Sequence, residues 1–351
     1  MSRLKDLPAH IFRFIESGVV AEFATVSATG VGIDTPTYYF PSDDMKTLDL
    51  ATGLQNPAKA ERARRNPKVG LLIEGRPEEP VVAVRGHAAV RDSDLEANMV
   101  RYISETGFKG ISYGLPWEEA RKAVTYWARI IVEITPLQVL WWDNRAAMAA
   151  PPRVWTAPAD TKLPVSDPCP PGSTTASPWP VRPWRELAHE ALRREATPPH
   201  LTVLDAAGYP MPMLACACDL VDEGFRLRVP AGTPWPLAGK ANVTFGGFDN
   251  FVGEAIPQGD AILFRVERGL PQTPAATSAT EVIMPKPETR SKQMARLEAE
   301  LARRGRALPH VPESLPRPTR LHALRQSRIA SGAPITGVTD AMRDRMTRPE
   351  D

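Results

Sequence analysis

The sequence lacks any apolar run long enough to cross a bilayer, so it offers no candidate transmembrane helix. Its first residues, MSRLKDLPAHIFRFIESG, scatter charges among the apolar positions and lack the continuous apolar region of a signal peptide. Apolar residues instead recur at helical spacing, which predicts an amphipathic helix from Leu4 to Ser17. We therefore expect a cytoplasmic protein that does not act at a membrane.

Cysteine is scarce, because the chain has only Cys169, Cys216 and Cys218. An odd count in a cytoplasmic chain argues against a disulfide framework. Cys216 and Cys218 alternate along an apolar stretch, so we expect both to be buried on one face of a strand. A metal site would need further ligands at short spacing, and His200, the nearest histidine, has no second histidine beside it. We therefore expect no metal site.

An excess of charge of either sign is also absent, because 43 Lys and Arg balance 41 Asp and Glu and leave a formal net charge of +2. A dedicated nucleic-acid binder usually has a strong basic excess, so we expect no nucleic-acid partner. The chain has no Walker loop, no GxGxxG after a strand, no HExxH and no GxSxG. Rossmann and hydrolase functions therefore have no support.

Proline is abundant, with 37 among 351 residues, and many of them fall between Pro151 and Pro183. Such a segment cannot hold a helix or a central strand, so it predicts an extended linker. Its tryptophans indicate that it lies against a domain surface. The predicted segments are a first domain at 1–150, a linker at 151–185, a second domain at 186–285 and a charged, partly helical tail at 286–351.

The first domain has the pattern of short strands joined by tight turns. A short basic helix, NPAKAERARRNP, interrupts them; Asn56 can cap its start, Pro57 suits its first position, and Asn66-Pro67 stops it. Mostly antiparallel strands indicate a mainly β (α+β) barrel or sandwich and not a doubly wound sheet. The predicted strand segments are residues 19–30, with a turn at Thr29-Gly30, 31–44, closed by an Asp-containing turn, 45–53, 68–75, 80–92 and a closing strand pair at 128–144, with helical segments between 93 and 126.

The second half of the chain partly repeats the first. The first half contains ATVSATG, then a strand, then LDLATG. The second half contains LTVLDAAG, PMPMLACACDLVD and FRLRVPAG in the same order and at nearly the same spacing. The second copy lacks the basic helix, although Lys240 follows a glycine much as Lys59 follows its turn. The match of several elements in order favours an internal duplication.

The segment from Ala24 to Asp92 resembles the pyridoxamine-phosphate-oxidase-like family of FMN-binding split β-barrels. The family pattern appears here as FATVSATG, DTPTYYF, LDLATG and PAKAERARRNPKVGLLIEG, followed by Gly86-His87-Ala88 on a later strand. The resemblance covers residues 1–150 well and the second half faintly. It implies tandem antiparallel split β-barrels, of which the second is degenerate, and an FMN bound to the first.

A phosphate site is expected where the strand that ends at Thr52 and Gly53 leads into the basic helix. A helix N-terminus offers unpaired N–H groups and positive potential, and cationic side chains surround this one. By the resemblance, Lys59 and Thr52 contact the FMN phosphate, with Asn56 or Arg62 assisting. A solvated basic helix without a ligand is the alternative.

Further residues are implied at the flavin ring. Thr35, Thr37 and Tyr38 lie on the strand that runs beside the ring in this family, although an ordinary barrel strand is the alternative. Trp142 and Arg145 follow the pattern of family members that cover the flavin of a partner subunit. A tryptophan pair in a core or an interface fits the same residues equally well.

The resemblance implies an FMN-dependent oxidoreductase that transfers a hydride to or from a small aromatic or heterocyclic substrate. Its electron partner could be oxygen, a nicotinamide or a reduced deazaflavin. No catalytic residue is assigned; His87 is a candidate proton donor, with a structural role favoured. The degenerate half is expected to supply a partner surface, so that the chain forms either an intramolecular pseudo-dimer or a homodimer, the usual form of the family.

Two other functions remain open. A haem-binding or haem-degrading protein on the same fold would need an axial histidine, whereas a cofactor-free barrel pair would act in protein binding. The placement of Lys59 at a helix start favours a phosphate over a porphyrin. The candidate haem ligands are His87, His189, His200, His310 and His322.

Overall fold

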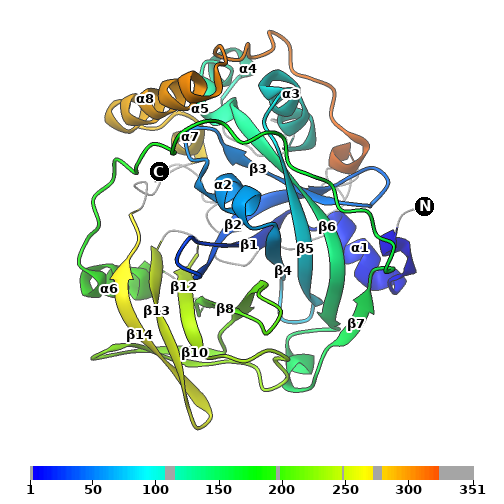
Figure 1. Ribbon diagram of the computed structural model, residues 1–351, viewed down its shortest axis with the longest axis vertical. Helices are drawn as coiled ribbons and strands as arrows, with labels where there is room; N and C mark the ends of the chain where they lie inside the picture. Colours follow the sequence, from blue (N-terminus) through cyan, green and yellow to red (C-terminus); the bar gives the residue numbers. More distant parts are fainter. Residues whose placement is uncertain (1–2, 107–114, 195–197, 247–248, 272–278, 324–351) are drawn as a thin grey trace.

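The computed structural model describes residues 3–106, 115–194, 198–246, 249–271 and 279–323. Two antiparallel sheets of seven strands each form the framework of the described chain, with helices around them (Figure 1). The predicted mainly β fold with two tandem antiparallel units is therefore confirmed. Within the described ranges, no helix is long and apolar enough to cross a membrane.

The first sheet closes into a barrel. Its strands follow the order β3-β2-β1-β4-β5-β6-β7. An additional pairing between β3, the first strand, and β6, the sixth, closes these six strands into a ring. The predicted strand pair at 128–144 was wrong, because β6 is one strand in which a register shift opposite Arg85 and Gly86 accommodates Pro136. The strands are β1 (Val20–Val26), β2 (Gly32–Pro41), β3 (Leu48–Gly53), β4 (Lys68–Ile73), β5 (Val81–Arg91), β6 (Arg129–Trp142) and β7 (Arg153–Thr156).

The helices are mostly short. The predicted helix from Leu4 to Ser17 is divided at Pro8, where a 3-10 turn precedes α1. The basic helix α2 starts after Pro57, which occupies the N-cap position predicted for Asn56. The helical elements are η1 (Arg3–Asp6), α1 (Ala9–Ser17), α2 (Ala58–Arg65), α3 (Leu95–Thr106), α4 (Trp117–Ala120), α5 (Val124–Trp127), η2 (Ala146–Ala149), α6 (Trp184–Arg194), α7 (Ala279–Ile283) and α8 (Pro287–Arg304).

The second sheet repeats the strand order of the barrel, with one strand divided in two. In the barrel, β2 pairs first with β1 and then, from Tyr39 onward, with β3. In the second sheet β9 pairs with β8, and β10 pairs with β11 at the opposite edge. The strands are β8 (His200–Leu204), β9 (Pro210–Leu214), β10 (Ala217–Val221), β11 (Gly224–Arg228), β12 (Gly239–Phe245), β13 (Asp249–Gln258) and β14 (Ala261–Gly269), in the order β10-β11-β14-β13-β12-β8-β9.

The division between β9 and β10 changes the environment of the cysteines. Cys216 lies in the break and is exposed, Cys218 is half-buried, and Cys169 is exposed. The expectation that Cys216 and Cys218 are buried was wrong, because β10 lies at the edge of the sheet and not inside a closed barrel.

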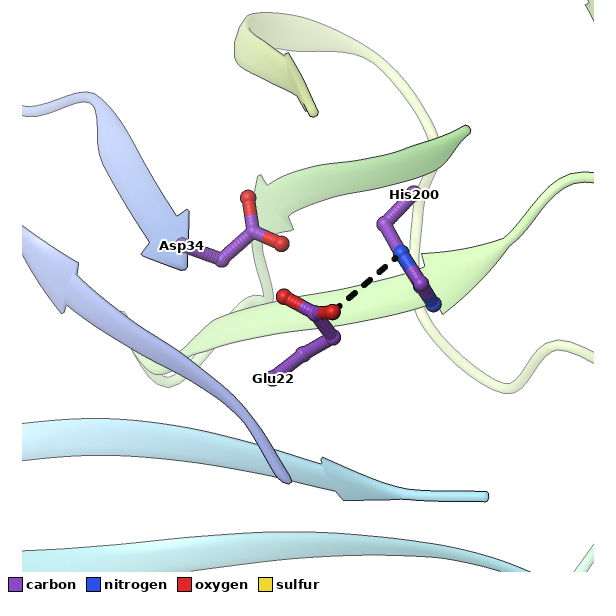
Figure 2. A group of neighbouring side chains, drawn as sticks. All are labelled: Glu22, Asp34 and His200. Atoms are coloured by element: carbon purple, nitrogen blue, oxygen red, sulfur yellow. Dashed lines mark ion pairs between the residues drawn. The ribbon is translucent and has the colours of Figure 1, made fainter. Parts of the chain in front are cut away.

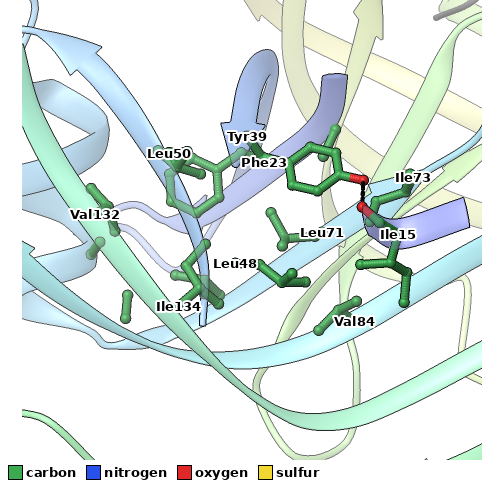
Figure 3. Packing of buried hydrophobic residues seen from close by; sticks show 14 of the residues in the cluster. Ile15, Phe23, Tyr39, Leu48, Leu50, Leu71, Ile73, Val84, Val132 and Ile134 are labelled. Carbon is green, nitrogen blue, oxygen red and sulfur yellow. Dashed lines mark hydrogen bonds between the residues drawn. The ribbon is translucent and has the colours of Figure 1, made fainter. Parts of the chain in front are cut away.

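Each unit has a core, and the second core extends into the first unit. Inside the barrel, Phe23, Leu50, Leu71 and Tyr39 pack together, and the Tyr39 hydroxyl donates a hydrogen bond to the Ile15 carbonyl at 2.7 Å (Figure 3). The second core contains four contacting phenylalanines together with residues from the outer face of β4, β5 and β6. The two units therefore share buried apolar surface.

The two units pack with approximate twofold symmetry. Lys68 at the start of β4 donates to the Ala207 carbonyl at 2.7 Å, and Lys240 near the start of β12 donates to the Thr29 carbonyl at 2.8 Å. These contacts are equivalent, because each lysine reaches the first hairpin turn of the other unit. The predicted correspondence of Lys240 with Lys59 was therefore wrong, since Lys240 occupies the place of Lys68.

The proline-rich segment runs along the first barrel. Its residues Arg153–Thr156 form β7, an edge strand that pairs with β6 and extends the first sheet past residue 150. Further along, the Asp167 carboxylate accepts hydrogen bonds from the backbone N–H groups of Asp92 and Ser93 at 2.8 and 2.9 Å. The segment is thus bound to a domain surface and is not a free tether.

Candidate functional site

The corner between β3 and α2 brings together five predicted residues: Thr52, Gly53, Asn56, Lys59 and Arg62. Thr52 is buried, and its hydroxyl donates to the Asn56 carbonyl at 3.3 Å, while the Asn56 N–H donates to the Gly53 carbonyl at 2.9 Å. This tight turn leads directly into α2, whose N-terminus has no side-chain cap. The first N–H groups of the helix are therefore available to an anion.

Two cations of α2 reach back to the barrel strands. Lys59 Nζ donates to the Thr37 hydroxyl of β2 at 2.8 Å, and Arg62 Nε donates to the Thr25 hydroxyl of β1 at 2.7 Å. Burial, together with the nearby guanidinium groups of Arg62 and Arg129, lowers the pKa of Lys59 to about 8. Burial also lowers the pKa of Arg62 to about 10.

Arg129 is a third cation at this corner, and no sequence pattern identified it. It stands opposite Gly53 in the β3–β6 ladder, and its guanidinium lies 4.3 Å from the ring centroid of Tyr102 and 4.5 Å from that of Tyr126. Its buried Nε has no hydrogen-bond partner among the described residues. A charged residue at the start of an apolar strand looks like an ordinary solvated strand end, so only the β3–β6 pairing reveals its position.

The charge at this corner is not neutralised by ion pairs. Among the residues that the structure describes, none of Lys59, Arg62 and Arg129 has a carboxylate in ion-pair contact, and the more distant Glu22 and Asp34 only partly oppose the fall in the Lys59 pKa. Three partly buried cations beside free helix N–H groups are costly unless an anion binds. The corner therefore fits a phosphate group.

The β2 residues predicted at a flavin ring divide between two faces. Thr37 faces Lys59, and Thr35 on the same face has a buried hydroxyl without a partner in the described part of the chain. Tyr38 points to the other face, toward Tyr102, and burial raises the pKa of its hydroxyl. Only the threonine pair thus shares a face with the cations of α2.

The structure does not bring Trp142 and Arg145 to this corner. Trp142 ends β6 and Arg145 follows it, whereas Arg129 begins this strand, which has 14 residues and is roughly 45 Å long at about 3.3 Å per residue. Trp142 is buried in the second core and donates from Nε1 to the Ala150 carbonyl at 2.8 Å. Arg145 donates to the Gly75 carbonyl at 3.1 Å. Their role at a flavin stays a prediction.

A second polar group lies where the two units meet, and we call Glu22, Asp34, Glu74 and His200 the interface cluster. His200 Nε2 is 2.8 Å from Glu74 Oε1, and Nδ1 is 3.7 Å from Glu22 Oε1. Figure 2 shows the carboxylates of Glu22 and Asp34 turned toward each other beside the His200 ring. Asp34 also accepts a hydrogen bond from the Thr244 hydroxyl at 2.7 Å.

Burial dominates the electrostatics of the interface cluster. It raises the pKa of Glu22 to about 8; His200 opposes this rise, while Asp34 and Glu74 add to it. Burial also raises the pKa of Asp34. Burial alone would lower the pKa of His200, but the carboxylates of Glu22 and Glu74 raise it to about 9. A second positive charge would stabilise this carboxylate-rich group.

The cluster follows from the approximate twofold symmetry. Val26 pairs with Gly32 and Leu204 with Pro210 around turns of equal length, so Glu22 and His200 occupy the same position in their units. A position that meets its own counterpart lies on the symmetry axis. In a true homodimer two glutamates would face each other there, whereas the duplicated chain places a histidine opposite the glutamate.

The histidines considered as haem ligands are placed apart. His200 is buried between the two units, with Glu74 2.8 Å from Nε2 and Glu22 3.7 Å from Nδ1. His87 lies against the linker, with Nε2 3.2 Å from the Pro164 carbonyl. His189 and His310 are exposed, and His322 is buried near the end of the described chain.

Comparisons with known proteins give structural likenesses only. No protein-family model matches the sequence, and no curated protein matches it. Solved structures similar to the chain include general stress protein 26 from Bacillus anthracis, with 17% identity and a TM-score of 0.30 over 42% of this chain and 96% of that one. A pyridoxamine 5'-phosphate oxidase-related, FMN-binding protein from Nostoc punctiforme has 15% identity and a TM-score of 0.31 over 40% of this chain and 84% of that one.

A FAD-binding protein from Mesorhizobium loti is similar to the same degree, with 18% identity and a TM-score of 0.27 over 38% of this chain and 92% of that one. Each likeness covers about two fifths of the present chain. The strand pairing itself defines the class of protein: a tandem antiparallel β-barrel protein in which a closed barrel packs against a second copy with one divided strand.

Proposed function

We propose that the chain is a flavoprotein of the pyridoxamine 5'-phosphate oxidase-like type that binds FMN at the β3–α2 corner. The observation that carries this proposal is the convergence of Lys59, Arg62 and Arg129, without carboxylate partners in the described chain, on the uncapped N-terminus of α2. A phosphate monoester is the anion that this arrangement fits best, because it accepts both charge-assisted and backbone hydrogen bonds.

The residues at the corner would divide the binding of FMN between them. Lys59 and Arg62 would hold the phosphate from the helix, and Arg129 would approach it from β6. Thr35, whose hydroxyl has no described partner, and Thr37 would donate to the polar edge of the ring from β2. Bound FMN supplies hydride transfer, and the protein orients it and excludes water.

The reaction that we propose is a hydride transfer between the flavin and a small aromatic or heterocyclic substrate. Hydride transfer itself demands no strong nucleophile and no acid–base pair. The electron partner would be oxygen, a nicotinamide or a reduced deazaflavin. His87 is a poor candidate for the proton donor, because its Nε2 lies 3.2 Å from the Pro164 carbonyl of the linker.

We also propose that the second unit takes the place of a partner subunit. Residues 229–238, all of which the structure describes, contain no counterpart of α2, so the second unit lacks the helix N-terminus that would hold a second phosphate. One flavin per chain is the expected stoichiometry.

The first test is the absorption spectrum of protein purified without added cofactor, followed by that of the supernatant after denaturation. A flavin spectrum with released FMN supports the proposal, whereas a Soret band would favour the haem alternative. Colourless protein that takes up no added FMN would favour a cofactor-free binding module.

Lys59→Ala tests the site itself. Loss of the charge partner of a partly buried phosphate should cost about 2–3 kcal/mol, which is a dissociation constant for FMN weaker by roughly 30- to 150-fold. Lys46→Ala is the matched control, because Lys46 lies in an exposed turn beside Asp44. A Lys59→Ala variant that binds FMN as tightly as the Lys46→Ala control contradicts the assignment.

A further inference from the structure

The interface cluster gathers three buried carboxyl groups around one basic group. Glu22, Asp34 and Glu74 are each less than a tenth exposed, and His200 is the basic group in contact with Glu22 and Glu74. One oxygen of Glu74 is buried without a hydrogen-bond partner among the described residues, and the carboxyl groups of Glu22 and Asp34 lie within hydrogen-bond reach of each other. Two buried carboxyl groups in contact either share a proton or bind a cation, so a metal ion has a proton to replace there.

Three potential ligand atoms converge at one point. One carboxylate oxygen of Glu22, one of Asp34 and one ring nitrogen of His200 all lie within 4.8 Å of one another (Figure 2). Divalent first-row metals bind imidazole nitrogen and carboxylate oxygen at about 2.0–2.2 Å. Small side-chain rotations would therefore bring the three atoms onto one ion.

Glu74 holds the histidine in a suitable orientation. Its carboxylate contacts Nε2 of His200 at 2.8 Å, so Nδ1 faces Glu22 and Asp34. Metal-binding histidines usually donate their other ring N–H to a carboxylate or a carbonyl, which fixes the tautomer and the ring. Glu74 is thus placed as a positioning residue behind the ligand.

We propose that Glu22, Asp34 and His200 bind one divalent first-row transition-metal ion between the two units, with Glu74 positioning His200. Two carboxylates neutralise the charge of the ion, and the oxygen and imidazole donors suit Zn²⁺, Mn²⁺ or Fe²⁺. The ion would join β1 and β2 of the barrel to β8 of the second unit, so it would tie the two halves together. This proposal does not depend on flavin binding.

Metal content is the first measurement. Full-length protein, purified without chelator, should contain about one Zn, Mn or Fe per chain by elemental mass spectrometry. Chelator-treated protein should take up added Zn²⁺ or Mn²⁺ saturably, and its melting temperature should rise as it does so. Added Co²⁺ should give visible absorption bands typical of nitrogen and oxygen ligands, a readout that needs no variant.

Variants locate the ion. Asp34→Asn keeps the shape of the side chain and should weaken metal binding more than about 100-fold, while Glu74→Gln should weaken it by about 10- to 100-fold. Asp49→Asn is the matched control, because Asp49 is a buried carboxylate of the same barrel that pairs with Arg101 outside the cluster. It should bind metal as the wild type does.

Two results would overturn the proposal. One is wild-type protein that contains no metal, takes up none of the added ions and melts at the same temperature with and without chelator. The cluster would then be a group of shared protons and ion pairs. The other is metal that Asp34→Asn and Asp49→Asn retain equally, which would place the ion elsewhere.

Discussion

Lys59 is the residue whose protonation most directly controls the proposed phosphate site. Burial, together with two nearby guanidinium groups, lowers its pKa to about 8 in the free protein, and its ammonium group donates to the Thr37 hydroxyl. A bound phosphate dianion would favour the charged form and raise this pKa again. Binding of FMN and protonation of Lys59 are therefore linked.

The linkage predicts a pH dependence of FMN affinity. Affinity should be full below the Lys59 pKa of the free protein, about 8, and should fall as the pH rises above it, by up to about tenfold per pH unit. Arg62, whose pKa is about 10, stays charged up to about pH 9, so the fall in affinity between about pH 8 and 9 reports on Lys59. The measurement is the dissociation constant of FMN from flavin fluorescence between pH 6.5 and about 10.

Lys59→Gln provides the control for this prediction. It has no ammonium to lose, so its weaker affinity should not fall with pH between about 7 and 9. A wild-type affinity for FMN that stays constant up to about pH 10 would show that the Lys59 ammonium group does not bind the phosphate.

Among the elements, α8 fixes the position of α2. Arg304 is almost fully buried and bonds Glu61 of α2 at 3.0 Å, Asp92 at 3.2 Å, and Glu300 within α8. Arg303 makes a second contact with Glu61. The face of α2 opposite the phosphate corner is therefore tied to the C-terminal helix, and the cations of α2 are held by a network that starts far away in the sequence.

Arg304→Ala should destabilise the protein by about 3 kcal/mol, because it leaves the buried carboxylates of Glu300 and Asp92 short of positive charge. Urea unfolding at neutral pH measures the loss. Arg290→Ala is the matched control on the same helix, at an exposed position, and should change stability by less than about 0.5 kcal/mol. Equal effects of the two variants would show that the network does not stabilise the fold.

The two units behave as one body because they share a core and approach each other closely. Gly70 of β4 lies against β9, and a Cβ at this position would be 1.7 Å from the Pro210 carbonyl oxygen. The outer face of the barrel strands is also part of the second core. We expect a single cooperative unfolding transition, since neither unit buries its apolar face alone.

Gly70→Ala should force the units apart locally and destabilise the protein by about 3 kcal/mol, because backbone atoms on the facing strand cannot move aside alone. Chemical unfolding followed by fluorescence measures this change. Lys68→Ala on the same strand loses an exposed hydrogen bond to the Ala207 carbonyl and a cation–π contact with Tyr209, and it should cost no more than about 1 kcal/mol. A Gly70→Ala variant as stable as the wild type would mean that the units do not pack this closely.

Local sequence patterns predicted most strands, because the alternation of apolar residues and the turn signals act over a few residues. Errors arose where tertiary context intervened: β6 continues through Pro136 by a register shift, and the predicted second-unit strand divides at Cys216. The β3–α2 corner was predicted because strand end, turn and helix are consecutive in the chain.

The sequence by itself determined the succession of strands, the duplication and the basic helix, since each is a local pattern. Only the tertiary structure decided which distant residues meet. Arg129 reaches the corner through the β3–β6 pairing, and His200 meets Glu74, 126 residues away, because the units pack about a twofold axis. Spacing along the chain gave no reason to expect a metal site, since no short motif encodes a cluster built from β1, β2 and β8.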